Sequence, residues 1–419
     1  MDVGTISGEV TSPTSGRWVV NDPNVALKIG DVIKYHVFVA VDSGGYLADN
    51  LTYIVTELED PSRPAQIPLN IPGGDCRPTV TKVSGSRACG GQTLFEDNFD
   101  NLREDVWRIE QYNPISHPEH PFMTYQRVTV SPTVTTTDGH LVIRPTLQQH
   151  QPGFTNESIY SGTLNLFSGC TAPGEACTVS ASTYNILPPV ISGRITSLFA
   201  FTYGTVYVKA KLPQGDWLYP EILLEPFMKK YGSQEYASGV LKIATARGNR
   251  ELSSGYKDYS NGVLYGGPIM DYDCRNMFLK NKVLGAGNLW GDDFHIYSLR
   301  WAPDRITLSV DGEEWGRIEP AASGLAGKFP ESCRHLPRTL LSYGTKMAPF
   351  DDLFQLSFGV AAGGITEFPQ SASTADGHPI PWVNSSPKAQ LKFWEDMNAW
   401  IQTWTQPELR IDYVKVVAL

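Results

Sequence analysis

One stretch of the 419-residue chain decides the fold: Ser238-Gly239-Val240-Leu241-Lys242-Ile243-Ala244-Thr245-Ala246-Arg247-Gly248-Asn249. Its apolar and β-branched residues predict a β-strand that runs into a turn. Side chains alternate between the two faces of a strand, so positions 240 and 242 share one face. Position 245 joins them on that face only if a β-bulge inserts one extra residue.

Other segments flank this strand in a characteristic order: Phe95–Asp100, Asp138–Arg144, Tyr203–Pro213, Leu212–Pro220, Tyr265–Pro268, Asp293–Trp301, Asp311–Gly312 and Leu409–Val416. With residues 238–249 they resemble glycoside hydrolase family 16 over about residues 92–419. The particular form resembles the arthropod β-1,3-glucan recognition proteins, also called Gram-negative bacteria-binding proteins. The resemblance implies an all-β, concanavalin-like jelly-roll sandwich and a bulge in the central strand.

The catalytic positions of that family are changed in this chain. Where active members carry Glu, Asp and Glu, the chain has Val240, Lys242 and Thr245. A retaining glycosidase needs two carboxyl groups roughly 5 Å apart across the scissile bond. The resemblance therefore implies a degenerate, non-catalytic domain.

Glu221 and Glu225 lie on a neighbouring predicted strand and are the alternative acid pair. Four residues along one strand separate them by about 13 Å, beyond the inverting range of roughly 6.5 to 9.5 Å. Exposure to solvent, or pairing with Lys229, Lys230 or Lys242, is the better interpretation of these two acids.

The resemblance also marks aromatic and polar positions around the strand as candidates for sugar contact: Trp217, Tyr219, His295 and Trp301. An aromatic face can bind a sugar ring by burying apolar surface. Against this, Trp301 is more typical of a core residue, and a single His is often only a structural donor. We expect the groove itself to persist without its carboxylates.

Composition excludes several classes of partner. The chain has 34 Lys and Arg against 44 Asp and Glu, and its net charge of −10 gives no reason to bind nucleic acid or an anionic membrane. No run approaches the 18 apolar residues of a membrane span. No motif for a cofactor or nucleotide is present, and we expect neither cofactor nor metal. A neutral polymer remains a natural partner.

The six cysteines lack the paired spacing of a zinc site and are read as disulfides. Local spacing favours Cys76 with Cys89 and Cys170 with Cys177, which leaves Cys274 with Cys333, although 15 connectivities are open. Glycosylation sequons at Asn50, Asn156 and Asn384 also indicate a secretory route. No signal peptide is recognised at the N-terminus, so extracellular localisation follows from the cysteines, the sequons and the resemblance.

Residues 1–58 alternate as strands at 16–20, 26–39 and 51–55, with a turn at 43–45. They resemble the second half of an immunoglobulin-like glucan-binding module, in which Trp18 is a candidate for sugar contact or a core residue. Since half a sandwich lacks covering strands, we expect glucan binding mainly in residues 92–419. Residues 59–91 are Pro- and Gly-rich and are read as a linker.

The large domain contains one predicted helix, from Pro387 to about Thr403. The sequence as a whole predicts a pattern-recognition protein of innate immunity that binds β-1,3-glucan, lipopolysaccharide or another bacterial wall polymer. Serine proteases or peptidoglycan recognition proteins are the partners that the resemblance implies. A residual β-1,3-glucanase and a scaffold that binds no sugar are the alternatives.

Overall fold

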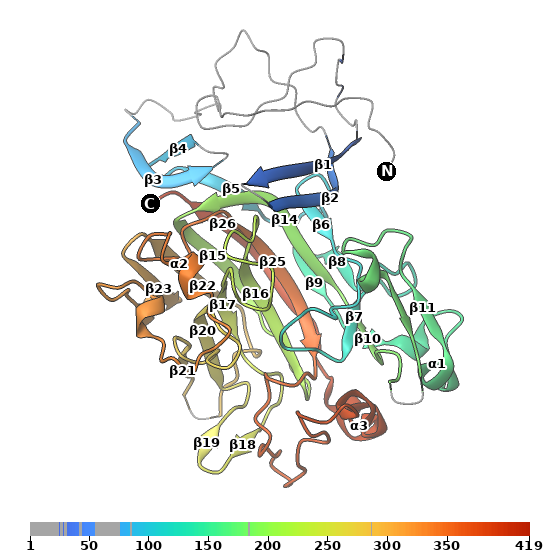
Figure 1. The fold of residues 1–419 in the computed structure, drawn as a ribbon. Coiled ribbons are helices and arrows are strands. Elements are labelled where there is room, and N and C mark those ends of the chain that lie inside the picture. The colour runs from blue at the N-terminus through green and yellow to red at the C-terminus, as the bar shows by residue number, and fades with distance from the viewer. Residues whose placement is uncertain are drawn as a thin grey trace. The chain divides into compact units, whose positions relative to one another are not determined.

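The computed structural model of the 419-residue chain divides into two units, residues 1–74 and 75–419 (Figure 1). It describes Val25, Lys28 and residues 32–41, 44–54, 76–83, 86–182, 185–285 and 287–419. No helix in these ranges is both long and apolar enough to cross a membrane.

The N-terminal unit contains an antiparallel hairpin of β1 (Val32–Val41) and β2 (Gly44–Ile54). β2 begins earlier than predicted, because Gly44 and Gly45 pair with the end of β1 instead of forming a turn. The strand predicted at residues 16–20, with Trp18, lies outside the described residues. The predicted extent of this module stays a prediction.

The large unit is built on two sheets. The first has the spatial order β21 (Lys280–Val283), β20 (Val263–Ile269), β17 (Val240–Thr245), β16 (Leu218–Pro226), β25 (Phe354–Ala362), β14 (Arg194–Thr202), β3 (Pro78–Val83) and β4 (Ser86–Cys89), with β6 (Trp107–Ile109) also pairing with β14. The second has the order β24 (Glu313–Ile318), β23 (Arg305–Val310), β22 (His295–Ala302), β15 (Gly204–Lys211), β26 (Leu409–Val417), β9 (His140–Ile143) and β8 (Val134–Thr137), with β5 (Thr93–Asp97) on β26.

Smaller strands and helices complete the unit: β7 (Met123–Tyr125), β10 (Thr146–Leu147), β11 (Thr163–Asn165), β12 (Thr178–Ser180), β13 (Val190–Ser192), β18 (Ser253–Ser254), β19 (Lys257–Asp258), α1 (Asn156–Ser161), α2 (Arg338–Leu341), α3 (Ala389–Glu395) and α4 (Met397–Trp400), with 3-10 turns at Gln148–His150, Gly174–Cys177, Ala326–Lys328 and Ile401–Thr403. The all-β sandwich expected from the sequence is thereby confirmed.

The core lies between the two sheets, as side-chain alternation dictates. Val206 and Val208 on β15 are buried, as are Ile222 and Leu224 on β16. Trp301 of β22 packs with its ring 5.2 Å from that of Phe354 on β25, across the sandwich. Each sheet therefore keeps one face for the core and leaves the other for a site.

Part of the predicted linker belongs to this sandwich. Residues 78–83 and 86–89 form β3 and β4 at the edge of the first sheet. Pro78 is tolerated there because it is the first residue of β3, and only Lys82 and Val83 at the other end of this strand pair with β14. Four of the five prolines in residues 59–91 precede Asp75, where the large unit starts, at positions 61, 64, 68 and 72.

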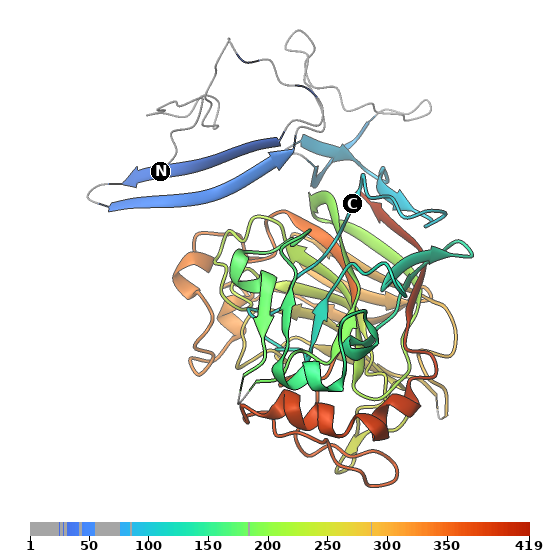
Figure 2. The ribbon, with the colours of Figure 1, turned by 90° about the vertical axis from the view of Figure 1, so that its right-hand side faces the viewer.

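The predicted helix is interrupted. It appears as α3 and α4, which lie at the end of the large unit opposite the C-terminus (Figure 2). Asp396, with φ −90° and ψ 6°, ends the first helix and starts the second. Phe393 and Trp400 stack at 4.6 Å within the core, so the apolar stripe serves packing, as predicted.

Candidate functional site

β17 is a central strand of the first sheet, between β16 and β20. Opposite β20 its register shifts: Lys242 pairs with Gly267 and Thr245 with Tyr265, so three steps on β17 match two on β20. This is the bulge that the resemblance implied. Thr245 is buried and donates its hydroxyl to the carbonyl of Pro220 on β16.

Lys242 is the centre of a buried ion cluster. Its Nζ lies 3.1 Å from Glu119 Oε1 and 3.2 Å from Glu367 Oε2. Arg275 bonds both carboxylates, and Arg247 lies 3.0 Å from Glu367 Oε1. All five side chains are at most 8% exposed. Buried charges require such partners, because an isolated ion in the interior is very costly.

The cluster fixes the protonation state of its acids. Burial by itself would raise the pKa of Glu119, but the charges of Lys242 and Arg275 hold that pKa well below its usual range. Burial opposes ionisation of Glu367 too, and Lys242, Arg247 and Arg275 lower its pKa. Both groups are therefore carboxylate anions at neutral pH.

A second buried cluster holds the alternative acid pair. Arg194 of β14 places Nη1 3.2 Å from Glu221 Oε1 and Nη2 2.5 Å from Glu225 Oε2. Tyr125 donates its hydroxyl to Glu221 at 2.7 Å. Despite burial, Arg194 lowers the pKa of Glu225. Our prediction that both acids face solvent or pair with lysines is wrong. They are bridged by Arg194 of β14, which is separated from their own strand, β16, by β25.

The floor of the predicted groove is covered. Tyr219, Glu221, Lys242 and Thr245 are each no more than 5% exposed. The segment carrying Glu119 lies over them and is joined to residues 364–365 by the Ile365 N–H donating to the Glu119 carbonyl at 2.9 Å. The expectation of an open groove is therefore wrong along this part of the sheet.

Gly364 permits the close approach of these two covering segments. Its φ is +107°, and a Cβ at this position would lie 2.7 Å from the Glu119 carbonyl oxygen. A side chain at 364 would thus meet both backbone strain and a steric clash. The cover over the strand depends on this residue.

One opening remains beside the cluster. It is a cavity of about 290 Å³ lined by Lys242, Thr245, Arg247, Lys257, Tyr259, Tyr265, Arg275, Asn276, Leu279, Asn281, Thr366, Glu367 and Pro369. These residues belong to β17, β20, β21, the β18–β19 hairpin and the loops around them. Burial raises the pKa of the Tyr265 hydroxyl, and nearby Arg247 and Lys257 partly oppose this.

Three of the predicted sugar contacts are core residues. Trp217, Tyr219 and Trp301 are at most 1% exposed, so no ring face is free to stack on a sugar. Trp301 also donates its indole N–H to the Phe350 carbonyl. His295 is partly exposed on the second sheet, bonded to Asp311 at 2.6 Å. The structure does not bring these four residues together as one platform.

The disulfides form as predicted: Cys76–Cys89, Cys170–Cys177 and Cys274–Cys333. Asp271 lies beside the third bridge. Because metal ligation by cysteine requires a thiolate, these bonded sulfurs offer no metal site.

The sequons differ in accessibility. Asn156 is exposed at the start of α1. The amide of Asn384 instead donates to the Phe368 carbonyl and accepts from the Trp382 indole N–H. Asn50 lies in β2, and its side chain is outside the described set.

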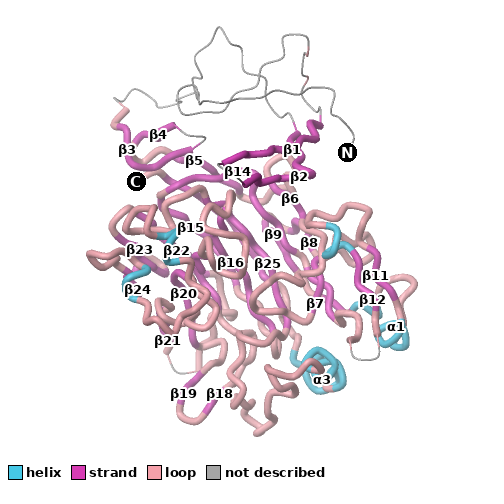
Figure 3. The backbone as a smooth tube through the Cα atoms, viewed as in Figure 1, coloured by secondary structure: helices cyan, strands magenta, loops and turns pink. Residues whose placement is uncertain are grey.

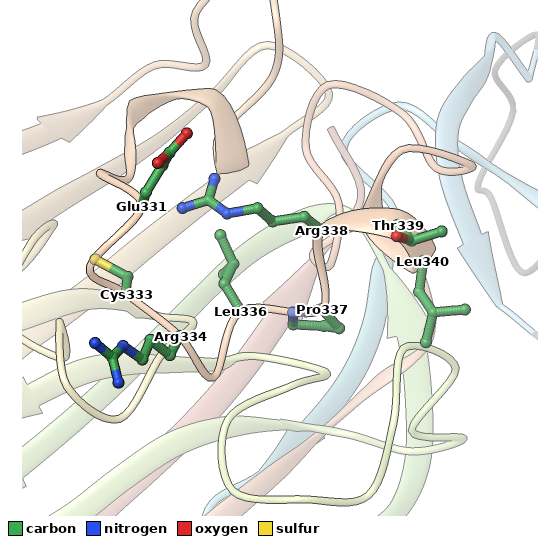
Figure 4. A pocket seen from close by; sticks show the side chains of 8 residues that line it. All are labelled: Glu331, Cys333, Arg334, Leu336, Pro337, Arg338, Thr339 and Leu340. Atoms are coloured by element: carbon green, nitrogen blue, oxygen red, sulfur yellow. The ribbon is translucent and has the colours of Figure 1, made fainter.

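A second, more open recess is lined by Glu331, Cys333, Arg334, Leu336, Pro337, Arg338, Thr339 and Leu340 (Figure 4). Arg338 is occupied there, donating to the carbonyls of Phe329 and Pro330. The recess adds no group of chemical interest to the site around β17.

Sequence reasoning missed Glu119, Arg194, Arg275 and Glu367. Glu119 and Glu367 lie 123 and 125 residues from Lys242 in the chain, so no local pattern connects them. One signal was present: a lysine in the middle of an otherwise apolar central strand must find buried acids.

Comparison with known proteins gives three findings. A family model described as Carbohydrate binding domain (family 32), CBM39, matches residues 1–67. "Beta-1,3-glucan-binding protein" of Hyphantria cunea is 61% identical over 420 residues, covering 100% of this chain and 87% of the relative. "Gram-negative bacteria-binding protein 1" of Drosophila melanogaster is 34% identical, covering 99% and 87%.

Among solved structures, the catalytic domain of an endo-1,3-beta-glucanase (laminarinase) from Thermotoga petrophila aligns with a TM-score of 0.48 and 18% identity. The alignment covers 78% of this chain and 97% of that one.

Proposed function

The chain belongs to the family of β-1,3-glucan-binding and Gram-negative bacteria-binding proteins, and from this premise we propose that it recognises microbial polysaccharide, chiefly β-1,3-glucan, without hydrolysing it. Its relatives are named for binding, and a carbohydrate-binding family model matches its N-terminal residues.

The state of the two acids beside β17 carries the non-catalytic part of this proposal. Glycoside hydrolysis requires one protonated carboxylic acid, with a raised pKa, to protonate the leaving oxygen. Glu119 and Glu367 have lowered pKa values and accept bonds from Lys242 and Arg275. They can neither donate a proton nor approach an anomeric carbon freely.

The pair Glu221 and Glu225 supports the same conclusion. Both carboxylates are bound to one guanidinium, that of Arg194. Glu225 has a lowered pKa and is held as an anion. A residual glucanase built on these acids would first have to break a buried arginine pair.

We now place the glucan contact in the N-terminal unit, which replaces our expectation from the sequence that glucan binds mainly in residues 92–419. The match of the carbohydrate-binding model to residues 1–67 supports this placement, and Trp18 remains our candidate there. The burial of the groove floor in the large unit argues against a polymer chain lying on it.

The test uses the full chain with insoluble β-1,3-glucan. Wild type should sediment with the glucan and release no reducing sugar from laminarin. Trp18→Ala should lose most of this binding, whereas Tyr343→Ala, which removes an aromatic side chain that is 80% exposed on the large unit, should keep it. Binding lost only in Tyr343→Ala would overturn the placement, and sugar release by purified wild type would overturn the non-catalytic assignment.

The proposal includes an extracellular site of action and a downstream protein partner. Three disulfides support an oxidising compartment. A serine protease or a peptidoglycan recognition protein is the kind of partner that family membership favours. Retention of such a protein on glucan only when this chain is present would support that part.

A further inference from the structure

The cavity beside β17 carries an excess of positive charge. Four cationic side chains line it: Lys242, Arg247, Lys257 and Arg275. One carboxylate, that of Glu367, also lines it, and a second, that of Glu119, contacts Lys242 and Arg275. The balance of four positive and two negative charges leaves two positive charges in a largely enclosed site. Charges in such a site are poorly screened by salt.

Lys257 accounts for part of this excess. It is exposed at the start of β19 and makes no ion pair among the described residues. Its Nζ lies 4.9 Å from the centre of the Tyr259 ring. The residue is therefore free to meet an anion at the mouth of the cavity.

Two buried donors of the lining also lack acceptors. Arg247 Nη1 and Arg275 Nε make no hydrogen bond of ordinary geometry within the described chain. The Tyr265 hydroxyl lies close enough to Arg247 for the guanidinium to oppose the rise of its pKa, but this contact falls outside ordinary hydrogen-bond geometry. Because a guanidinium N–H can only donate, the missing partner is an acceptor. Guanidinium groups match the planar, bidentate geometry of carboxylate and phosphate.

Size and surroundings favour a sugar as the carrier of that acceptor. A volume of about 290 Å³ is at the lower end of ligand pockets, roughly 300 Å³ upward, and suits one terminal unit, not a polymer. Tyr259 and Tyr265 line the cavity. Tyr256 is fully exposed at the tip of the β18–β19 hairpin, which projects from the large unit (Figure 3). Aromatic rings of this kind contact sugar rings through apolar burial.

We propose that this cavity binds the oxyanion of an acidic sugar unit, a carboxylate or a phosphate, on a microbial glycan. The position that carries Lys242 in place of a catalytic carboxylate then belongs to a second recognition site, distinct in ligand class from neutral β-1,3-glucan. The inference rests on the proposed recognition function and extends it to acidic glycans.

Calorimetric titration of the full chain tests the proposal with three probes: trigalacturonate, glucose 6-phosphate and neutral laminaritriose. At least one anionic probe should bind at the cavity, and binding should weaken only modestly as NaCl rises from about 50 to 500 mM, because the site is largely enclosed. Lys257→Gln should weaken that binding roughly threefold. Arg247→Lys keeps the charge but removes the planar guanidinium that can bind an oxyanion through two N–H groups. This change should weaken binding of the anionic probe about tenfold or more. Exposed Lys388→Gln is the matched control and should bind as wild type.

The outcomes separate this site from glucan recognition. Cosedimentation with insoluble β-1,3-glucan should be unchanged in both cavity variants, and near-ultraviolet circular dichroism should show each to be folded. Binding of only one anionic probe identifies the group. The inference is overturned if wild type binds neither anionic probe, or if Lys257→Gln binds them as tightly as wild type. Either result would leave glucan binding intact. Wild type that does not cosediment with β-1,3-glucan would instead overturn the proposed function.

Discussion

Replacing Lys242 by methionine should strongly destabilise the large unit. The change keeps much of the side-chain volume but removes the ammonium that lies 3.1 and 3.2 Å from two buried carboxylates. Breaking a buried pair by removing one partner typically costs about 3–5 kcal/mol, because the other charge stays buried without compensation. Arg275 still contacts both acids, so we expect the lower part of this range.

The assay is urea denaturation followed by tryptophan fluorescence. Nine of the ten tryptophans, all except Trp18, belong to residues 75–419, so the signal reports the large unit. Lys388→Met, at an exposed position, is the control and should change the unfolding free energy by less than about 0.5 kcal/mol. If Lys242→Met were as stable as this control, the electrostatic account of the cluster would be refuted.

The pH dependence of the loss follows from the lowered pKa values of Glu119 and Glu367. A depressed carboxyl pKa stabilises the fold above the unfolded value of about 4.3, and this contribution is lost as pH falls through the folded pKa. Without Lys242 the pKa values of Glu119 and Glu367 are lowered less, so the variant has less of this stabilisation to lose on acidification. The difference in stability between wild type and Lys242→Met should therefore narrow as the pH is lowered below about 4.

Three further outcomes are expected. Gly364→Ala should lower the unfolding free energy by about 1–3 kcal/mol in the same assay, because its Cβ would meet a backbone carbonyl at a positive φ; an unchanged midpoint would contradict this. On secretion from an insect cell line, mass spectrometry should find glycan on Asn156 and none on Asn384, whose amide is bonded within the fold; the reverse pattern would refute the accessibility argument. The triple change Val240→Glu, Lys242→Asp and Thr245→Glu restores the three carboxylates of the family. It should release no reducing sugar from laminarin, because the new acids would join two buried carboxylates under a covered floor. Measurable release would contradict that account.

Local pattern was sufficient for the strand and for two of the three disulfides, and Cys274–Cys333, 59 residues apart, followed only as the remaining pair. The alternation around β17 indicated a strand, and the spacing of Cys170 and Cys177, only 7 residues apart, indicated their bridge. Both depend on residues close in sequence. The all-β sandwich followed in the same way, from many short segments in a known order.

The content of the site could not be predicted in this way. A tryptophan such as Trp217 reads alike as a sugar platform or as core, and only tertiary packing places it at 0% exposure. Arg194 meets Glu221 from a strand two positions away in the sheet, on the far side of β25. Charge pairing of this kind depends on which strands become neighbours, which no single segment encodes.

The ion cluster at β17 also bears on how such a domain could change over time. Each of its acids is shared by at least two cations, so a mutation at Lys242 alone leaves its partners buried and mismatched. A path back to a hydrolase would pass through intermediates that fold poorly, since several coordinated substitutions are needed before any of them is useful. The absence of hydrolysis that we propose is thus a state that the buried ion cluster makes hard to reverse, and the strand stays available for other uses.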